Sequence, residues 1–168
     1  MIDLQKIPKY YRGYVESLGE GELVPLLLRT GDAFISFCKL LNEAQGLYKY
    51  AEDKWTVKDV ILHSIDAERV FAYRAMRFAR NDKTELSGFD QNIYVPEAYA
   101  NDRSIHSLLS EFTNVRASTV DMFSSFSEEV RQRTGKASGV EISVEAIGFI
   151  ISGHLSHHLD IIKERYTS

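Results

Sequence analysis

The sequence has 168 residues, of which 44% are hydrophobic and 26% are charged, and its formal net charge is −4. This length and balance predict a single globular domain over residues 1–168 with a buried core. Lysines and arginines are dispersed among carboxylates, so we expect no nucleic-acid partner, and no apolar run reaches the roughly 20 residues that span a bilayer, so we expect no membrane partner.

The first residues lack the charged-then-apolar order of a secretory signal, which predicts a cytoplasmic protein. Residues 7–14 are rich in tyrosine and are interrupted by Pro8 and Gly13, so we expect a short arm laid across the fold. Apolar residues then recur every three to four positions, a pattern typical of amphipathic helices. The predicted long helices span residues 22–44, 57–80, 105 onward and 144–166. These lengths fit a four-helix bundle, and the predicted fold class is all-α.

Local signals indicate how these helices begin and how they are joined. Thr56 can cap the second helix, and Asp59 can return a hydrogen bond to the cap amide. Gly135 to Gly139 predict a turn before the last helix. From residue 81 to 103 the helical periodicity lapses, which leaves a long connection between the second and third helices. Such a connection either covers a functional site or only joins two helices.

The histidines provide the main functional signal. His154 and His158 lie one helical turn apart, on the same face of the last predicted helix and beside its apolar side. They are either core histidines with hydrogen-bond partners or two ligands of a divalent metal ion. His63 also faces inward from the second helix, which favours the metal site. Three neutral nitrogens that leave a position for water or substrate are typical of a catalytic metal site.

Asp66 lies one turn beyond His63, and its role has two interpretations. In the functional one, the carboxylate acts as a general base or fixes the tautomer of a ligating imidazole. In the structural one, it is an ordinary helix carboxylate that pairs with Arg69 or Arg74.

Three further residues are expected to lie outside the site. His157 is rotated by about 60° from His154 on the helical wheel, in the direction away from His158, so we expect it at a helix interface or in solvent. His106 is expected on the surface. Cys38 has the spacing of a small core residue, and no base that would activate its thiol can be named.

Several segments together resemble the DinB/YfiT-like superfamily, whose members are described as metalloenzymes. The resemblance covers essentially the whole chain and implies a four-helix bundle in up-down-down-up order. It also implies a metal held by one histidine of the second helix and two of the fourth, roles that pass to His63, His154 and His158. The segments that carry it are Tyr48–Asp59, His63–Arg69, Phe71–Arg80, Gly88–Asp90, Gly153–His154 and His157–His158.

The resemblance also suggests activities, which differ within the superfamily. Some members transfer low-molecular-weight thiols such as bacillithiol or mycothiol onto electrophiles, others isomerise maleylpyruvate with mycothiol, and others are called hydrolases. We therefore expect a small-molecule substrate and a thiol S-transferase, in which Arg74 contacts carboxylates of the thiol cosubstrate. The alternatives are a hydrolase that uses metal-bound water and a metal-binding stress protein without catalysis.

The identity of the metal and the oligomeric state are also expectations. Zinc or nickel is expected at the histidines, with iron and manganese as alternatives, because imidazole suits several of these ions. The resemblance also implies a homodimer.

Overall fold

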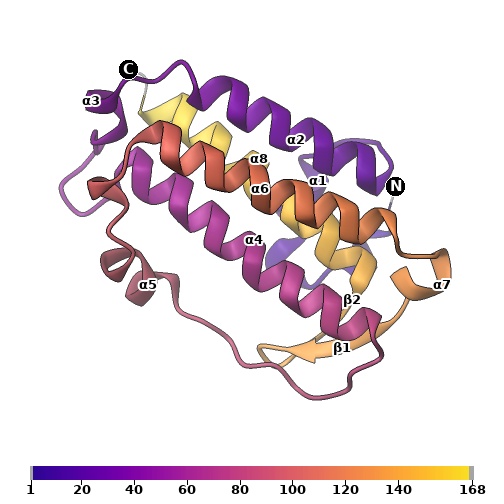
Figure 1. Ribbon diagram of the computed structural model, residues 1–168. Helices are drawn as coiled ribbons and strands as arrows, with labels where there is room; N and C mark the ends of the chain where they lie inside the picture. The colour runs from indigo at the N-terminus through magenta and orange to yellow at the C-terminus, as the bar shows by residue number, and fades with distance from the viewer. Residues whose placement is uncertain (1, 167–168) are drawn as a thin grey trace.

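The computed structural model describes residues 2–166, and four long helices lie side by side in it (Figure 1). In Figure 1, α2 and α8 run from right to left, whereas α4 and α6 run from left to right. Both α8 and α6 pack against α2 and α4. The predicted four-helix bundle is confirmed. Its helices are α2 (Leu23–Cys38), α4 (Val57–Ala79), α6 (Ile105–Ser124) and α8 (Val144–Arg165).

The start of α4 follows the predicted capping pattern. The Thr56 hydroxyl accepts a hydrogen bond from the Asp59 amide at 3.0 Å, and the Asp59 carboxylate accepts one from the Thr56 amide at 2.9 Å. The end of the first long helix differs from the prediction, since α2 ends at Cys38 rather than near residue 44. Asn42 caps a separate short helix, α3 (Glu43–Gly46), so a new helix start interrupts the apolar pattern there.

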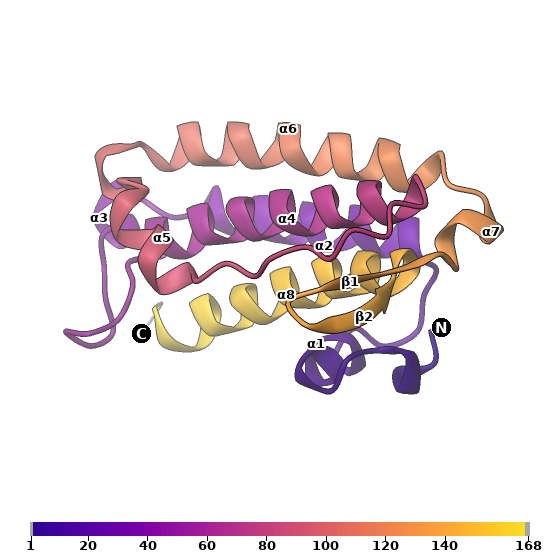
Figure 2. The same cartoon turned by 90° about the horizontal axis from the view of Figure 1, so that it is seen from below.

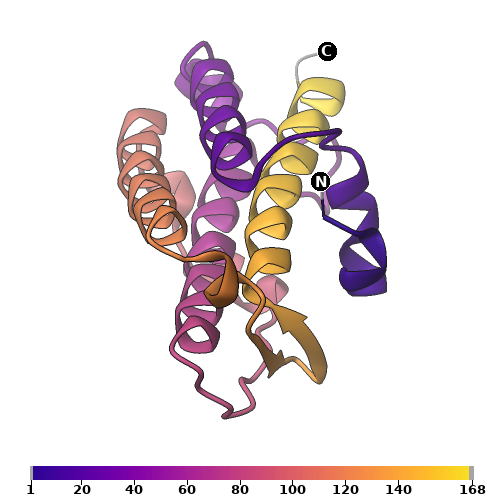
Figure 3. The same ribbon diagram turned by 90° about the vertical axis from the view of Figure 1, so that its right-hand side faces the viewer.

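The tyrosine-rich arm packs along α8, outside the four long helices (Figures 2 and 3). It consists of η1 (Leu4–Lys6), η2 (Lys9–Tyr11) and α1 (Arg12–Glu16). A Cβ atom on Gly153 of α8 would lie 2.4 Å from the Tyr14 carbonyl oxygen. Glycine is therefore required at this position for the arm to approach α8 so closely.

The long connection is partly ordered, because it contains α5 (Gln91–Glu97) and η3 (Ala100–Asp102). Leu86 forms a parallel bridge to Ala137, which ties the first part of the connection to a β-hairpin. Figure 2 shows this hairpin beside the N-terminal part of α8.

The described chain is mostly helical, as predicted, but it also contains a β-hairpin that was not predicted. The hairpin pairs β1 (Thr134–Ala137) with β2 (Val140–Ser143) in antiparallel register and follows α7 (Glu128–Arg131). Ser138 and Gly139 form its two-residue loop with φ values of 52° and 78°, which suits a type I′ turn. The turn predicted over residues 135–139 is thus shorter than expected, and strands occupy the rest.

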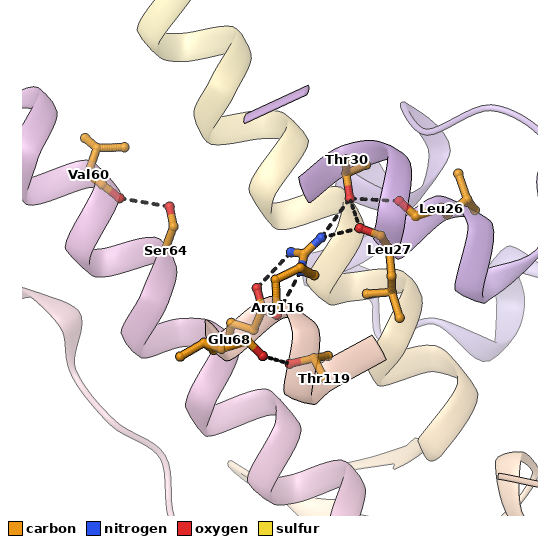
Figure 4. A network of polar contacts seen from close by, with 9 residues as sticks. Leu26, Leu27, Thr30, Val60, Ser64, Glu68, Arg116 and Thr119 are labelled. Carbon is orange, nitrogen blue, oxygen red and sulfur yellow. Dashed lines mark hydrogen bonds and ion pairs between the residues drawn. The ribbon is translucent and has the colours of Figure 1, made fainter. Parts of the chain in front are cut away.

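A buried ion pair crosses the bundle core (Figure 4). The Arg116 guanidinium of α6 donates two hydrogen bonds of 2.8 Å to the Glu68 carboxylate of α4. Its third nitrogen donates to the Leu27 carbonyl at 2.6 Å and to the Thr30 hydroxyl at 3.1 Å, both in α2. The network therefore links three helices, and the sequence analysis did not predict it.

The last expectation on the fold concerns membranes. Over residues 2–166, the structure contains no helix with the length and apolar character needed to cross a bilayer.

Candidate metal centre

Three histidines from two helices converge at the α4–α8 interface. The Nε2 atom of His154 lies 3.3 Å from Nε2 of His63 and 3.1 Å from Nε2 of His158. One ring nitrogen from each histidine lies within 4.8 Å of those of the other two. The structure therefore brings together the three residues that the sequence analysis selected as ligands.

These distances fit a shared cation better than hydrogen bonds between the rings. A single Nε2 of His154 either carries a proton or offers a lone pair, so it cannot form two good hydrogen bonds to two other imidazoles. Two nitrogens about 2.0–2.1 Å from a tetrahedral zinc ion would be roughly 3.3–3.4 Å apart. The observed spacings around His154 are close to that range. Three imidazoles so arranged could hold one divalent ion.

The protonation of the histidines also suits a metal. Burial lowers the pKa of His63 to about 4. Burial, followed by the nearby His63 and His157 rings, lowers the pKa of His154 to about 3. The pKa of His158 is likewise well below its ordinary value, first because of burial. All three rings are therefore neutral at pH 7, and their lone pairs are available to a cation.

A cavity of about 270 Å³ adjoins the histidines. The tyrosine-rich arm and the long connection both contribute to its wall, so part of the connection covers the site. The aromatic and polar lining residues beside the three histidines are Tyr10, Tyr11, Tyr14, Trp55, Phe71, Arg74, Phe89, Gln91 and Ser138. A metal bound by the histidines would thus face a space that a small molecule can enter.

Arg74, the predicted substrate contact, lines this cavity. It is on the same side of α4 as His63, and its side chain is buried. One of its terminal nitrogens donates to the Ser87 carbonyl at 3.0 Å and to the Ser138 hydroxyl at 2.9 Å. The loop before α5 and the hairpin turn therefore fix the guanidinium at the cavity wall.

Asp66 pairs with Arg69, as in the structural interpretation of this residue. Its carboxylate lies 3.7 Å from Arg69, which in turn lies 2.6 Å from Glu111 of α6. Asp66 is not among the residues that line the histidine cavity. Burial raises its pKa, but the group lies in an ion-pair network directed toward α6. No role as a base at the histidines follows from this placement.

The remaining candidates lie where the sequence analysis expected them. The His157 ring packs 4.7 Å from the Tyr14 ring of the arm, and His106 is exposed. Cys38 is fully buried, and burial raises the pKa of its thiol to about 12. Its thiol is therefore neither accessible nor ionised at neutral pH.

Several residues of the cavity wall were not predicted from the sequence. Phe89, Gln91 and Ser138 come from the connection and the hairpin, where no helical periodicity places a side chain. Tyr11 and Tyr14 could have been found, because a tyrosine-rich arm was expected to cross the fold. An aromatic segment next to a predicted metal site is a signal for such a wall.

Comparisons with known proteins place this geometry in a family. The sequence model described as the DinB superfamily matches residues 26–162. The fold is similar to that of YfiT from Bacillus subtilis, described as a probable metal-dependent hydrolase with an unusual four-helix bundle topology. That alignment has a TM-score of 0.75 and 14% identity, and covers 98% of this chain and 90% of YfiT. No curated protein sequence matches the chain.

A mycothiol-dependent maleylpyruvate isomerase has a similar fold as well, with a TM-score of 0.69 and 15% identity. The alignment covers 95% of this chain but only 63% of the isomerase. At these identities the two likenesses show a shared fold, and they carry no reaction over to this chain.

Proposed function

The chain belongs to the DinB superfamily, and from that premise we propose that it is a metal-dependent enzyme that transfers a low-molecular-weight thiol onto an electrophile. One observation carries the choice of reaction. The cavity wall beside the histidines contains a guanidinium, several aromatic rings and no Asp or Glu among the described residues that line it. Such a site suits a reaction that needs no carboxylate base.

His63, His154 and His158 would hold the ion through their Nε2 atoms, with zinc or nickel expected and iron or manganese as alternatives. When bound, the ion would favour the thiolate form of a thiol at neutral pH. Arg74 would orient an anionic group of a substrate, because its buried guanidinium faces the same cavity. The arm and Phe89 would limit the access of water.

The transfer can be written with its atoms and electrons balanced. The thiol releases its proton to solvent, and its sulfur donates an electron pair to form a bond to the electrophilic carbon. The leaving group departs with the electron pair of the bond that breaks. The products are a thioether, the leaving-group anion and a proton. No oxidant or reductant takes part.

Hydrolysis is the second candidate, because a divalent ion held by the three histidines could also activate a water molecule. Hydrolysis by an activated water usually requires a group that accepts the water's proton. Asp66, the residue expected to serve in that way, is directed toward Arg69 instead. A non-catalytic metal staple is less well supported, because the histidine cluster adjoins a cavity rather than being enclosed by the core.

The test uses the untagged full chain. We expect about one equivalent of a divalent metal by elemental analysis, and its loss on replacing His63, His154 or His158 by alanine. His106→Ala is the matched control, since His106 is an exposed histidine away from the cluster. The metal-loaded protein should consume bacillithiol, mycothiol or glutathione in the presence of a panel of electrophiles.

Two results would overturn the proposal. One is full metal retention in the three alanine variants. The other is no thiol consumption by the metal-loaded protein while a known transferase reacts alongside it. Metal-dependent cleavage of esters or amides without any thiol would favour the hydrolase instead.

A further inference from the structure

Three lysine or arginine side chains in the described chain are buried, and they differ in their partners. Arg116 is 5% exposed and pairs with Glu68 at 2.8 Å. Lys58 is 4% exposed and pairs with Glu43 at 2.7 Å. Arg74 is 5% exposed, yet no carboxylate oxygen of residues 2–166 lies within 4.0 Å of its nitrogens. Arg74 is therefore a buried cation without an anionic partner from the protein.

A buried cation is costly unless an anion or several hydrogen bonds compensate it. All the partners that the structure gives Arg74 are uncharged. They are the Ser87 carbonyl, the Ser138 hydroxyl and the Tyr11 hydroxyl, together with the Phe71 ring, whose centroid lies 5.9 Å from the guanidinium carbon. A guanidinium has five N–H donors and binds carboxylates in a planar, bidentate manner. Because Arg74 lines a cavity, a ligand could supply the missing negative charge.

Arg74 also lines a second cavity, of about 230 Å³. Its wall is mainly apolar and is formed by the arm, the hairpin and the start of α8. The residues found only in this second cavity are Pro8, Ala137, Val140, Ile142 and Ile147. The residues that line both cavities are Tyr10, Tyr11, Phe71, Arg74 and Ser138. The two cavities are thus neighbours, and Arg74 lines both of them.

We propose that this second cavity is a substrate subsite, which binds the apolar chain of an amphipathic carboxylate whose charged group pairs with Arg74. Two features identify the ligand class. The wall offers apolar contacts to a chain, and Arg74, which lines both cavities, offers one buried positive charge. This inference rests on the proposed function, because it assumes that the reaction takes place in the histidine cavity. It adds the class of substrate that the site selects.

The test measures equilibrium binding of straight-chain alkanoates, from acetate to decanoate, by calorimetry. The full chain is used both metal-loaded and after chelation, so that binding of a carboxylate to the metal is recognised. Each added methylene that enters the subsite should tighten binding by about threefold to fourfold, until the cavity is filled. Octanamide, which has the same chain length without the charge, should bind at least tenfold more weakly than octanoate.

Two variants separate the charge from the apolar wall. Arg74→Gln should weaken octanoate by about tenfold or more and should affect octanamide much less, because octanamide carries no charge to pair with the guanidinium. Val140→Gln should weaken octanoate severalfold and leave acetate unchanged, because Val140 lines only the apolar cavity. Ile93→Gln is the matched control. It replaces another exposed apolar residue by glutamine outside both cavities and should have no effect.

Affinities that do not depend on chain length, or a Val140→Gln variant that binds octanoate like the unmodified chain, would overturn the subsite. Equal binding of octanoate and octanamide would overturn the role of the Arg74 charge. Val140 is 44% exposed, so its replacement tests the subsite even if Arg74→Gln fails to fold. The assay involves no turnover, so its outcome is independent of whether the chain transfers thiols.

Discussion

Two faces of α4 carry polar groups in opposite states. On the face toward α2 and α6, Glu68 and Arg116 form a closed network in which each charge has its partner within the protein. On the face toward α8, His63 offers a neutral nitrogen, and Arg74 offers a charge without a carboxylate partner among residues 2–166. The closed network contributes to the fold, whereas the groups of the open face line a cavity that a ligand can enter.

The positions of Glu68 and His63 on α4 show how one helix can both stabilise the core and line the cavity. Glu68 follows His63 by five residues, which turns it about 140° around the helix axis. Its charge is thereby separated from the histidine cavity and is neutralised in the core (Figure 4). A carboxylate on the cavity side would compete for Arg74 and for the cation. Glu68 instead pairs with Arg116 in the core (Figure 4), so its carboxylate does not occupy the cavity beside the histidines.

The largest effect on stability is expected from breaking the closed network. Glu68→Ala would leave the Arg116 guanidinium buried without an anion, which should lower the free energy of unfolding by about 3–5 kcal/mol. Urea unfolding followed by circular dichroism measures this change. A loss below about 1 kcal/mol would show that the core tolerates an unpaired guanidinium, and the contrast with Arg74 would lose its meaning.

Two controls accompany this measurement. A double replacement of Glu68 and Arg116 by methionine removes both charges and should recover much of the lost stability, because no charge is then left unpaired. His63→Leu, on the open face, should change the stability of the metal-free protein far less than Glu68→Ala while removing a metal ligand.

A smaller effect is expected from acid on the metal-free protein. His63 has a folded pKa of about 4 against an ordinary value of 6.5. Below about pH 6.5 the unfolded chain binds a proton at this residue and the folded chain does not, so stability falls as the pH falls toward 4. His63 alone should account for up to about 3 kcal/mol of this loss.

Unfolding titrations from about pH 7 to about pH 4 in the presence of a chelator would reveal this loss. His63→Leu removes the titrating group, so its stability should decline less steeply than that of the unmodified chain. Parallel declines in the two proteins would contradict the neutral, buried state of His63.

The features that could be predicted from the sequence are those that depend on local patterns. His154 and His158 were identified because residues four apart on a helix share a face, and His63 because the periodicity of its own helix directs it inward. Thr56 and Asp59 marked the start of α4 because a capping box is a local pattern. These signals depend only on residues that are close in sequence.

The missed features depend on residues far apart in the chain. Glu68 and Arg116 are separated by 48 positions, and neither carries a local pattern that names the other. Ser138 reaches Arg74 because a two-residue hairpin turn places it there, and its strands are too short to show clear alternation. The end of α2 was predicted too late because apolar spacing continues past Cys38, although Asn42 starts a new helix.

The smallest effect on stability is expected at Ser152, whose buried hydroxyl lacks the partners that Glu68 and Arg116 have. Its side chain is on α8 and 0% exposed, and its hydroxyl has no hydrogen-bond partner within the described chain. By contrast, the buried Ser64 hydroxyl of α4 donates to the Val60 carbonyl at 2.8 Å. Ser152→Ala should therefore raise the free energy of unfolding by about 1 kcal/mol, because an unpaired buried hydroxyl is removed.

Ser64→Ala is the matched control, since both replacements gain the same helix propensity and differ only in the hydrogen bond that is lost. The Ser64 variant should be about 1 kcal/mol less stable than the Ser152 variant when both are measured by urea unfolding. If the two variants are equally stable, or if Ser152→Ala is the less stable, then the Ser152 hydroxyl has a partner in solution. In that case the core around α8 is as fully paired as the network of Glu68 and Arg116, and unmet polar groups are confined to the open face of α4.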